Sequence, residues 1–389
     1  MANKKVAVIN TQSFGSTGQI ARAIMNAYEG ESRLFCFREK EKFDNVTAIE
    51  LSKLSDLASH SISRIDGNDG FHYHAFSEKL IKELDEYKPD IIHLHNLHGY
   101  YLNVPILFNF IKEKNIKVIW TLHDFWPLTG RCAVPGDCEN FLTGCQTCLN
   151  KGNYPFAILH NEKEMFPKRK ELFTSLENVT IVTPSEYLMN YVKQTHLNKY
   201  PGVVINNGID LEKFFYEESD LKEKLEIPQD KKVLLSVMLP ISSHKGIEYI
   251  NKLASELDDK YLILLVGTND DNFELSSKIK HIPFVSQEEL HLYYSMADLF
   301  INPTLSDTYP TVDMEAIASG LQILSYDTGG SKEIVTLDVG RIVARRDYEA
   351  FKNSIEDMVN HPLPKENFLK RRENFSKERM IEKYLKLYK

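Results

Sequence analysis

The sequence has few of the features that would place the protein in a membrane, outside the cell or on a nucleic acid. Its first residues, MANKKVAVINTQ, lack the apolar run of about 7–15 residues that marks a secretory signal. No stretch approaches the roughly 18 uninterrupted apolar residues of a membrane-spanning helix. A formal net charge of −8 argues against general nucleic-acid binding. We therefore expect a cytoplasmic protein with no nucleic-acid partner, whose membrane contact is at most peripheral.

The chain does have length and a regular alternation of strand and helix patterns. Its 389 residues, 42% of them hydrophobic, suffice for two domains of about 150–200 residues each. Short apolar runs such as VAVIN alternate with amphipathic segments such as AFSEKLIKELDEYKP. This alternation predicts an α/β fold with parallel sheets. The pattern restarts after GVVINNGID, which we interpret as the link between a first domain, 1–203, and a second, 204–371.

The C-terminal tail departs from the acidic balance of the chain. Residues 365–389 carry nine Lys and Arg against four Glu, with apolar residues interleaved: Phe368, Phe375, Met380, Tyr384, Leu385 and Tyr388. One interpretation is a terminal helix that packs its apolar face on a domain. The other is a basic amphipathic helix that contacts an anionic membrane, and both can hold at once.

The most informative segment is 306–335, SDTYPTVDMEAIASGLQILSYDTGGSKEIV. It places two acids, Asp307 and Glu315, around the start of a small-residue helix, and an apolar strand and a Gly-Gly turn follow. Ligands bind at the carboxyl ends of strands in open α/β sheets. Carboxylates suit sugar hydroxyls, and free amides at a helix N-terminus suit phosphates. The segment therefore indicates a nucleotide-sugar site, although a loop acid and a helix acid without function remain the alternative.

The same segment resembles the acid-x7-acid motif of the family 4 retaining glycosyltransferases, and Gly329, Gly330 and Glu333 follow at that family's spacing. The resemblance implies the GT-B fold, in which two doubly wound, Rossmann-like domains face each other across a cleft. It also implies that the second domain binds the nucleotide sugar and that a final helix, about 372–389, packs back on the first. Many relatives have Glu where this chain has Asp307, whose shorter side chain reaches less far.

The resemblance assigns donor contacts to the residues between and at the two acids. Backbone amides from Tyr309 to Val312 would bind the sugar and diphosphate, and Glu315 the ribose hydroxyls. Because Pro310 has no N–H, Thr311 and Val312 are the better donors. Asp307 would hold the donor sugar.

Lys245, followed by Gly246 in PISSHKGIEY, is expected to open a helix after the strand VLLSVM. An ammonium at a helix N-terminus suits a diphosphate. Many relatives carry an Arg shortly before this Lys-Gly, whereas 237–244 contain none here, so Ser242, Ser243 or His244 would have to substitute. A surface lysine at a helix start is the alternative.

Two segments of the first half match the family. His123 and Asp124, in TLHDFWPLTG, follow a predicted strand, and the resemblance places His123 against the donor sugar with Asp124 orienting it or facing the acceptor. The alternative is a hydrogen-bonded structural histidine. Gly15 and Gly18, in SFGSTGQI, form a loop that in relatives faces the donor phosphates or the acceptor. Such a G-x-x-G can equally be an ordinary strand-to-helix turn.

The histidine-rich segment DIIHLHNLHGYY supplies candidates for the acceptor side. His93 and His95 point to one face of a strand, which raises the possibility of a metal site. Without a nearby pair of acids, a polar wall is the better interpretation. We therefore expect Asn96, His98 and Tyr100 to face the acceptor.

Cysteines are concentrated in one short region. Cys132, Cys138, Cys145 and Cys148 have the spacing C-x5-C-x6-C-x2-C, and Cys36 lies apart in a predicted strand. In a cytoplasmic chain such a cluster favours a structural zinc ion, with free thiols and disulfides as alternatives. Four thiolates would fill the coordination shell, so the zinc would not be catalytic. Similar words (HDFWPLTGRC, GDCE, TGCQTC) occur in bacterial polysaccharide-building relatives, which implies capsule or exopolysaccharide assembly.

These observations together predict a metal-independent retaining transferase. Its donor would be a nucleoside-diphosphate sugar and its acceptor a saccharide or lipid-linked saccharide. Lys245 and the loop amides would stabilise the leaving diphosphate, and Asp307 and His123 would hold the sugar. The alternatives are a non-catalytic binding or scaffold protein of the same fold, and a sugar-nucleotide epimerase or phosphorylase.

Overall fold

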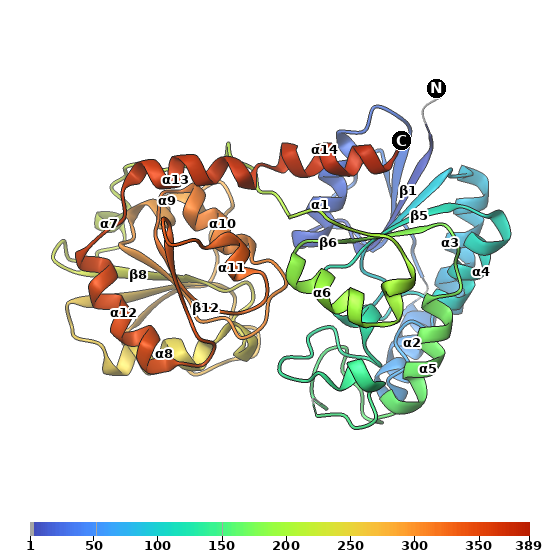
Figure 1. The fold of residues 1–389 in the computed structure, drawn as a ribbon, viewed down its shortest axis with the longest axis horizontal. Helices are drawn as coiled ribbons and strands as arrows, with labels where there is room; N and C mark the ends of the chain where they lie inside the picture. Colours follow the sequence, from blue (N-terminus) through green and yellow to red (C-terminus); the bar gives the residue numbers. More distant parts are fainter. Residues whose placement is uncertain (1–3, 52, 150) are drawn as a thin grey trace. The chain divides into compact units, whose positions relative to one another are not determined.

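The computed structural model describes residues 4–51, 53–149 and 151–389. The chain divides into two compact units: Met1–Ile205 with Ile381–Lys389, and Asn206–Met380. Each unit is built around one sheet in which every strand pair is parallel. Figure 1 shows each sheet with helices packed against it. The α/β class predicted from the alternating pattern is confirmed.

The first unit has a seven-stranded sheet in the order β3-β2-β1-β4-β5-β6-β7. Its strands are β1 Val6–Gln12, β2 Ser32–Arg38, β3 Val46–Ala48, β4 Ile91–Leu94, β5 Lys117–Thr121, β6 Val179–Thr183 and β7 Gly202–Val204. Strand order reverses at β1, which pairs with β2 on one side and β4 on the other. The loops after β1, β4 and β5 therefore emerge side by side, where polar residues gather.

The helices of the first unit are α1 Gly15–Asn26, α2 Lys53–Asp66, α3 His74–Tyr87, α4 Val104–Lys114, α5 Glu162–Phe173 and α6 Glu186–Gln194. Helix α3 buries Phe76, Leu80, Leu84 and Tyr87, the stripe expected from its sequence. Helix α4 begins after Asn103, whose side chain accepts a hydrogen bond from the amide of Ile106. Strands β3 and β7 and helices α2 and α5 were not predicted.

The second unit has a six-stranded sheet in the order β10-β9-β8-β11-β12-β13. Its strands are β8 Lys232–Val237, β9 Tyr261–Val266, β10 Ile279–Ile282, β11 Leu299–Asn302, β12 Ile323–Tyr326 and β13 Gly340–Val343. Successive residues of β8 point to opposite faces, so Leu235 joins one apolar cluster and Leu234 the other. The order places β11 directly beside β8, which brings the loops after these two strands together.

Helices cover both faces of the second sheet, with α8 and α12 on one face and α9, α10 and α13 on the other (Figure 1). The helices of this unit are α7 Leu221–Lys224, α8 Ile247–Glu256, α9 Leu290–Met296, α10 Thr311–Ala318, α11 Ser331–Ile334, α12 Tyr348–Asn360 and α13 Lys365–Arg372. The last helix, α14 Lys377–Leu387, begins in this unit and ends in the first.

The unit boundaries differ in detail from the expected domains. The expected boundary after residue 203 falls inside β7, which pairs with β6 and so belongs to the first sheet. The chain returns to the first unit at Ile381 rather than near 372. The intervening residues stay with the second unit, because Ile209 and Ser376 form a bridge and the Ile209 amide donates to the Phe375 carbonyl at 2.7 Å.

The C-terminal tail packs its apolar side chains against the protein. Phe368, Phe375, Met380, Tyr384 and Tyr388 are all buried. The packing interpretation of the tail therefore holds at these residues, which are not exposed for insertion into a membrane. Among the described residues, every helix is too short or too polar to traverse a bilayer.

Candidate active site

An ion pair between Lys245 and Asp307 forms the centre of the candidate site in the second unit. Lys245 lies in a 3-10 turn after β8, Ser243–Lys245, just before α8 rather than at its first residue. Its ammonium donates to Asp307 at 2.5 Å, and both side chains stay partly exposed. Burial opposes the lysine's charge, but the Asp307 carboxylate outweighs it and raises the pKa of Lys245. The cation is therefore held in place, charged and reachable.

Two glycines permit the loops around this pair to pack closely. A Cβ atom at Gly246 would lie 2.2 Å from the Pro303 carbonyl oxygen, and one at Gly329 would lie 1.6 Å from the Asp307 carbonyl oxygen. Both glycines also have positive φ, +85° and +56°. Gly246 and Gly329 therefore allow the loops after β8, β11 and β12 to pack against one another around Lys245 and Asp307.

Two further acids, Asp313 and Glu315, are buried on helix α10. The Asp313 carboxylate accepts a hydrogen bond from Asn302 at 2.6 Å, and the Glu315 carboxylate accepts one from the Tyr294 hydroxyl at 3.0 Å. Burial raises the pKa of each carboxyl to about 7. Asp307 raises the pKa of Asp313 further, while Asn302 and Lys245 lower it. These carboxyls therefore titrate near neutral pH.

The first turn of α10 supplies the expected amides. Pro310 precedes the helix, and Thr311 and Val312 are its first two residues and are partly exposed. Helix N-termini leave backbone N–H groups without intrahelical partners. Tyr309 is buried, and its amide donates to Asp307 at 3.1 Å. Thr311 and Val312 are thus the better placed donors.

The three residues expected to replace the arginine found in many relatives differ in exposure and in hydrogen bonding. Ser242 is partly exposed, and Ser243 and His244 are exposed. The Ser243 hydroxyl donates to Glu248 at 2.5 Å. The His244 carbonyl accepts the Leu305 amide at 2.8 Å, which ties this turn to the loop after β11. Ser242 and the His244 ring keep the freedom to meet a ligand.

In the first unit, His123 ends a chain of hydrogen-bonded and stacked histidines. Its Nε2 lies 2.9 Å from Nδ1 of His95, and the rings of His95 and His93 are 4.2 Å apart. Burial lowers the pKa of His123 to about 4 and that of His93 to about 3. His95 is also held well below its ordinary pKa, first by burial. These side chains are therefore neutral hydrogen-bonding groups at pH 7.

Residues at the C-terminal end of the protein contact His93, the histidine of this series that lies farthest from His123. His93 contacts the Tyr388 hydroxyl at 2.7 Å and the Thr121 hydroxyl at 2.8 Å. The Thr121 hydroxyl donates to that of Tyr384 at 3.2 Å. The end of α14 therefore helps to fix the orientation of residues that lead to His123.

His98 and Asp124 form a second, charged pair. Their nearest atoms are 2.6 Å apart, and Asp124 also accepts the Trp126 amide at 2.9 Å. Burial opposes both charges, but mutual attraction outweighs it: the pKa of His98 is raised and that of Asp124 lowered. Asp124 thus pairs with His98, and the histidine that contacts His123 is His95.

The other acceptor-side candidates lie in the same loop after β4. Tyr100 is buried, and its hydroxyl donates to the Phe156 carbonyl at 2.9 Å. The Asn96 carbonyl accepts the Tyr101 hydroxyl at 2.7 Å, while its side chain is only partly buried. Asn96 is therefore more accessible to a ligand than Tyr100.

Gly15 and Gly18 form a tight connection between β1 and α1. Gly15 has a φ of +68°, and a Cβ atom at Gly18 would lie 2.6 Å from the Ser13 carbonyl carbon. Both glycines are thus required by the turn itself. The backbone there is available to a ligand as well, because the helix starts at this turn.

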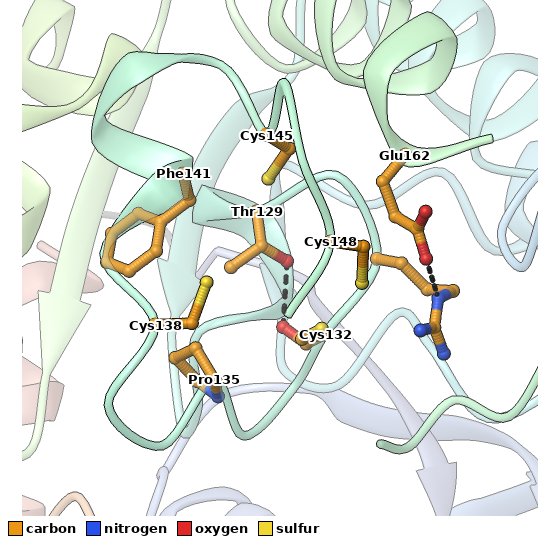
Figure 2. A pocket seen from close by; sticks show the side chains of 9 residues that line it. Thr129, Cys132, Pro135, Cys138, Phe141, Cys145, Cys148 and Glu162 are labelled. Atoms are coloured by element: carbon orange, nitrogen blue, oxygen red, sulfur yellow. Dashed lines mark hydrogen bonds and ion pairs between the residues drawn. The ribbon is translucent and has the colours of Figure 1, made fainter. Parts of the chain in front are cut away.

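The structure gathers the predicted residues into one group in each unit. Lys245 and Asp307 meet in the second unit, with Glu315 buried on helix α10, and His98, His123 and Asp124 follow neighbouring strands in the first. Sequence reasoning passed over Asp313, an acid in the first turn of α10, and gave His95 no role toward His123. The four clustered cysteines line a separate pocket in the first unit (Figure 2).

Comparisons with known proteins agree with this geometry. The family model Glycosyltransferase Family 4 matches residues 30–213, and the model Glycosyl transferases group 1 matches residues 217–379. A protein of Escherichia coli K12 assigned to colanic acid biosynthesis, the glycosyl transferase WcaC, is 25% identical over 329 residues, covering 77% of this chain and 76% of that protein. The alpha-monoglucosyldiacylglycerol synthase of Acholeplasma laidlawii is 24% identical, covering 66% of this chain and 63% of the synthase.

Solved structures show the same fold at low identity. Sucrose-phosphate synthase from Thermosynechococcus elongatus aligns with a TM-score of 0.73 at 16% identity, covering 99% of this chain and 98% of the synthase. Anabaena HepE in complex with UDP-glucose aligns with a TM-score of 0.69 at 14% identity and covers 99% of both chains. The fold is thus GT-B, and the chain belongs to the family 4 glycosyltransferases.

Proposed function

We propose that the enzyme transfers a sugar, with retention of configuration, from a nucleoside-diphosphate sugar to a saccharide or lipid-linked saccharide acceptor in surface polysaccharide assembly. The Lys245–Asp307 pair beside the first turn of α10 is the observation that carries this proposal. A held cation next to unpaired helix amides suits a diphosphate. The names of WcaC and of the HepE complex support the acceptor class and the donor class.

The proposed reaction needs stabilisation of a leaving group rather than a covalent nucleophile. The bond from the anomeric carbon to the diphosphate oxygen breaks as an acceptor hydroxyl attacks from the same face. The proton of that hydroxyl passes to the departing phosphate oxygen. Lys245 and the amides of Thr311 and Val312 stabilise the charge that develops there. Asp307, whose carboxylate contacts Lys245 and the Tyr309 amide, serves to orient the sugar.

Donor binding would exchange the partners of Lys245. In the structure Asp307 holds the ammonium at 2.5 Å. When a diphosphate arrives, Lys245 turns to it and Asp307 is released to accept hydrogen bonds from the sugar. Glu315 takes the ribose hydroxyls. The Gly15–Gly18 turn offers its amides to phosphate or acceptor.

We assign the acceptor to the loops after β4 and β5. The charged His98–Asp124 pair and the partly exposed Asn96 offer both donors and acceptors to hydroxyl groups. Tyr100 is buried and supports this loop through its hydrogen bond to the Phe156 carbonyl. The same set would recognise a saccharide whether or not it is attached to a lipid. The Acholeplasma synthase, named for a glycolipid product, supports a lipid-linked acceptor.

Contact with an anionic membrane is part of the proposal, through a surface other than the tail. Helix α2 exposes Leu57, Ile62 and Ile65, and the segment beside it exposes Ile158 and Leu159, each at 48–65%. The Ile158 amide donates to the Arg64 carbonyl at 2.8 Å, which places the two stretches side by side. Arg64 adds a positive charge suited to anionic lipid.

Vesicle sedimentation tests this membrane contact. The wild-type chain should bind vesicles of anionic lipid more strongly than neutral ones, and Ile62→Glu with Ile158→Glu should weaken binding about tenfold or more, since two apolar side chains leave the lipid. Leu337→Glu, at another exposed leucine, is the matched control. Equal sedimentation of the double variant and the wild type would contradict the assignment.

The function is tested by measuring nucleoside diphosphate release from UDP-, GDP-, dTDP- and ADP-sugars. Release should require one donor class together with a saccharide or polyprenyl-linked saccharide acceptor, and should persist in EDTA. NMR of the product should show the donor's anomeric configuration. Donor binding without turnover under any acceptor would favour the scaffold alternative, and an inverted product would exclude the proposed reaction.

A further inference from the structure

Residues 129–161 form a long segment with little regular structure between β5 and α5. In its described part it contains one short 3-10 helix, Asn140–Thr143. Segments of this length without helix or strand are uncommon in compact domains and need a means of being held. One such means is visible: the buried Arg131 donates to Glu162 at 2.8 Å and to the carbonyls of Asn153 and Lys151 at 2.6 and 3.2 Å.

The four clustered cysteines line a pocket that borders this ion pair. Thr129, Pro135 and Phe141 complete its wall together with Arg131 and Glu162, and the cysteine side chains approach from several sides (Figure 2). The cavity measures about 20 Å³, room for one ion or one water molecule. Residues separated along the chain thus place four cysteine side chains around one small cavity.

The backbone around the pocket is arranged for these sulfurs. The Gly130 amide donates to Sγ of Cys145 at 3.3 Å. A side chain at Gly130 would have its Cβ 2.8 Å from the Glu162 carbonyl oxygen and 3.3 Å from Cβ of Cys145, so only glycine fits. Amide hydrogen bonds to a sulfur favour its anionic form, the form that binds metals.

We propose that Cys132, Cys138, Cys145 and Cys148 together bind one zinc ion, which holds the 129–161 segment in place. Zinc accepts four thiolates, and C-x2-C spacing such as that of Cys145 and Cys148 is typical of structural zinc. Each thiol releases its proton as it binds. Within the described ranges no three His, Cys, Asp or Glu side chains already lie close enough to hold a metal, so binding draws the sulfurs inward across the small cavity.

This zinc would have a structural role that extends to the acceptor-side loop. Four sulfur ligands leave no coordination position for a substrate. The segment also carries Tyr154, whose hydroxyl lies 3.4 Å from Nδ1 of His98, and Phe156, whose carbonyl accepts the Tyr100 hydroxyl at 2.9 Å. Loss of zinc should therefore loosen the surroundings of His98 and Tyr100 and leave the second unit unchanged.

Metal content of the full chain tests the proposal independently of transferase activity. Protein purified under reducing conditions should contain one zinc per chain by elemental analysis. Cys145→Ser and Cys148→Ser should each lose it. Cys36→Ala is the matched control and should retain it, because Cys36 is buried in β2 away from the pocket. Cobalt taken up by the wild type should show the intense thiolate-to-cobalt absorption of a four-sulfur site.

Chelation of the folded wild type keeps the test valid if the variants fail to fold. Removing zinc should increase amide hydrogen exchange in 129–161 and lower the melting temperature, and added zinc should restore both. A wild-type chain that neither contains zinc nor takes up zinc or cobalt would overturn the proposal. So would disulfides among the four cysteines in freshly purified protein, or full zinc retention by Cys145→Ser.

Discussion

Both units carry polar side chains where parallel strands end, but the two sets differ in charge. In the first unit His93 and His95 are buried and His123 is partly buried, all three are neutral, and His98 pairs with Asp124. In the second, a charged lysine pairs with Asp307 and interacts with the buried acid Asp313. The first set suits neutral hydroxyl groups and the second suits a diphosphate, so the division of ligands between the units follows from their side chains.

The largest expected effect comes from removing the cation of the second unit. Lys245→Ala should lower kcat/KM about a hundred- to a thousandfold, the usual consequence of losing one preorganised group that stabilises developing charge. Steady-state kinetics with the preferred donor measures this. Lys278→Ala, which removes an exposed lysine of the same unit, should have no effect. If both variants retain full activity, the diphosphate is bound elsewhere.

The two units should also respond oppositely to acid. His93, His95 and His123 have lowered pKa values when folded, so the unfolded chain binds more protons below pH 6.5 and the first unit loses stability as pH falls. The loss is about 2 kcal/mol per fully buried histidine between pH 6.5 and 5. His98, with its raised pKa, partly opposes this loss.

The acids of the second unit act in the reverse sense. Asp313 and Glu315 have pKa values raised to about 7, so their folded forms bind more protons between about pH 4 and 7, and stability falls as pH rises through that window. Hydrogen exchange corrected for intrinsic rates should show β4 and β5 less protected at pH 5 than at pH 7.5, and β11 and α10 more protected. Asp313→Asn should flatten the second response. A uniform response of both units would contradict the contrast.

The smallest expected effect comes from lengthening the side chain at position 307 while its negative charge is kept. Asp307→Glu keeps the carboxylate that pairs with Lys245 and adds one methylene, for which about a tenfold change in kcat/KM is expected. Asp307→Ala, which leaves Lys245 without its partner, should cost considerably more. Parallel kinetics on the two variants decides this, and equal losses would show that the length of the acid matters more than its charge.

Much of the fold and part of the site follow from the sequence, for physical reasons. The alternation of apolar runs with amphipathic segments identified most core strands. Short motifs that contain glycine or acidic residues indicated where those strands end. Lys245 and Asp307, however, meet because β8 and β11 are neighbours, and strand order is set by packing across the whole sheet. The link from His123 through His95 and His93 to Tyr388 has the same origin, since it joins two strands to the far end of the chain.

Other elements escaped prediction because their local signals were weak. Helix α5 has Pro167 in its interior, and its buried face includes the charged residues Glu162 and Arg169, so its sequence lacks a clear apolar stripe. Asp313 gave no signal of burial, because an acid in the first turn of a helix is usually a solvated residue that complements the helix dipole. Its partner Asn302 lies at the end of a different element, β11.

Titration calorimetry of the wild type and Lys245→Ala with UDP, GDP, dTDP and ADP tests the central claim most directly. The account predicts that one of these nucleoside diphosphates binds the wild type and that its affinity falls tenfold or more in the variant, because an ammonium within reach of a diphosphate contributes at least about 1.4 kcal/mol. Equal affinity in the two proteins would contradict the assignment of the diphosphate to Lys245, and binding of none to the wild type would contradict the donor site itself.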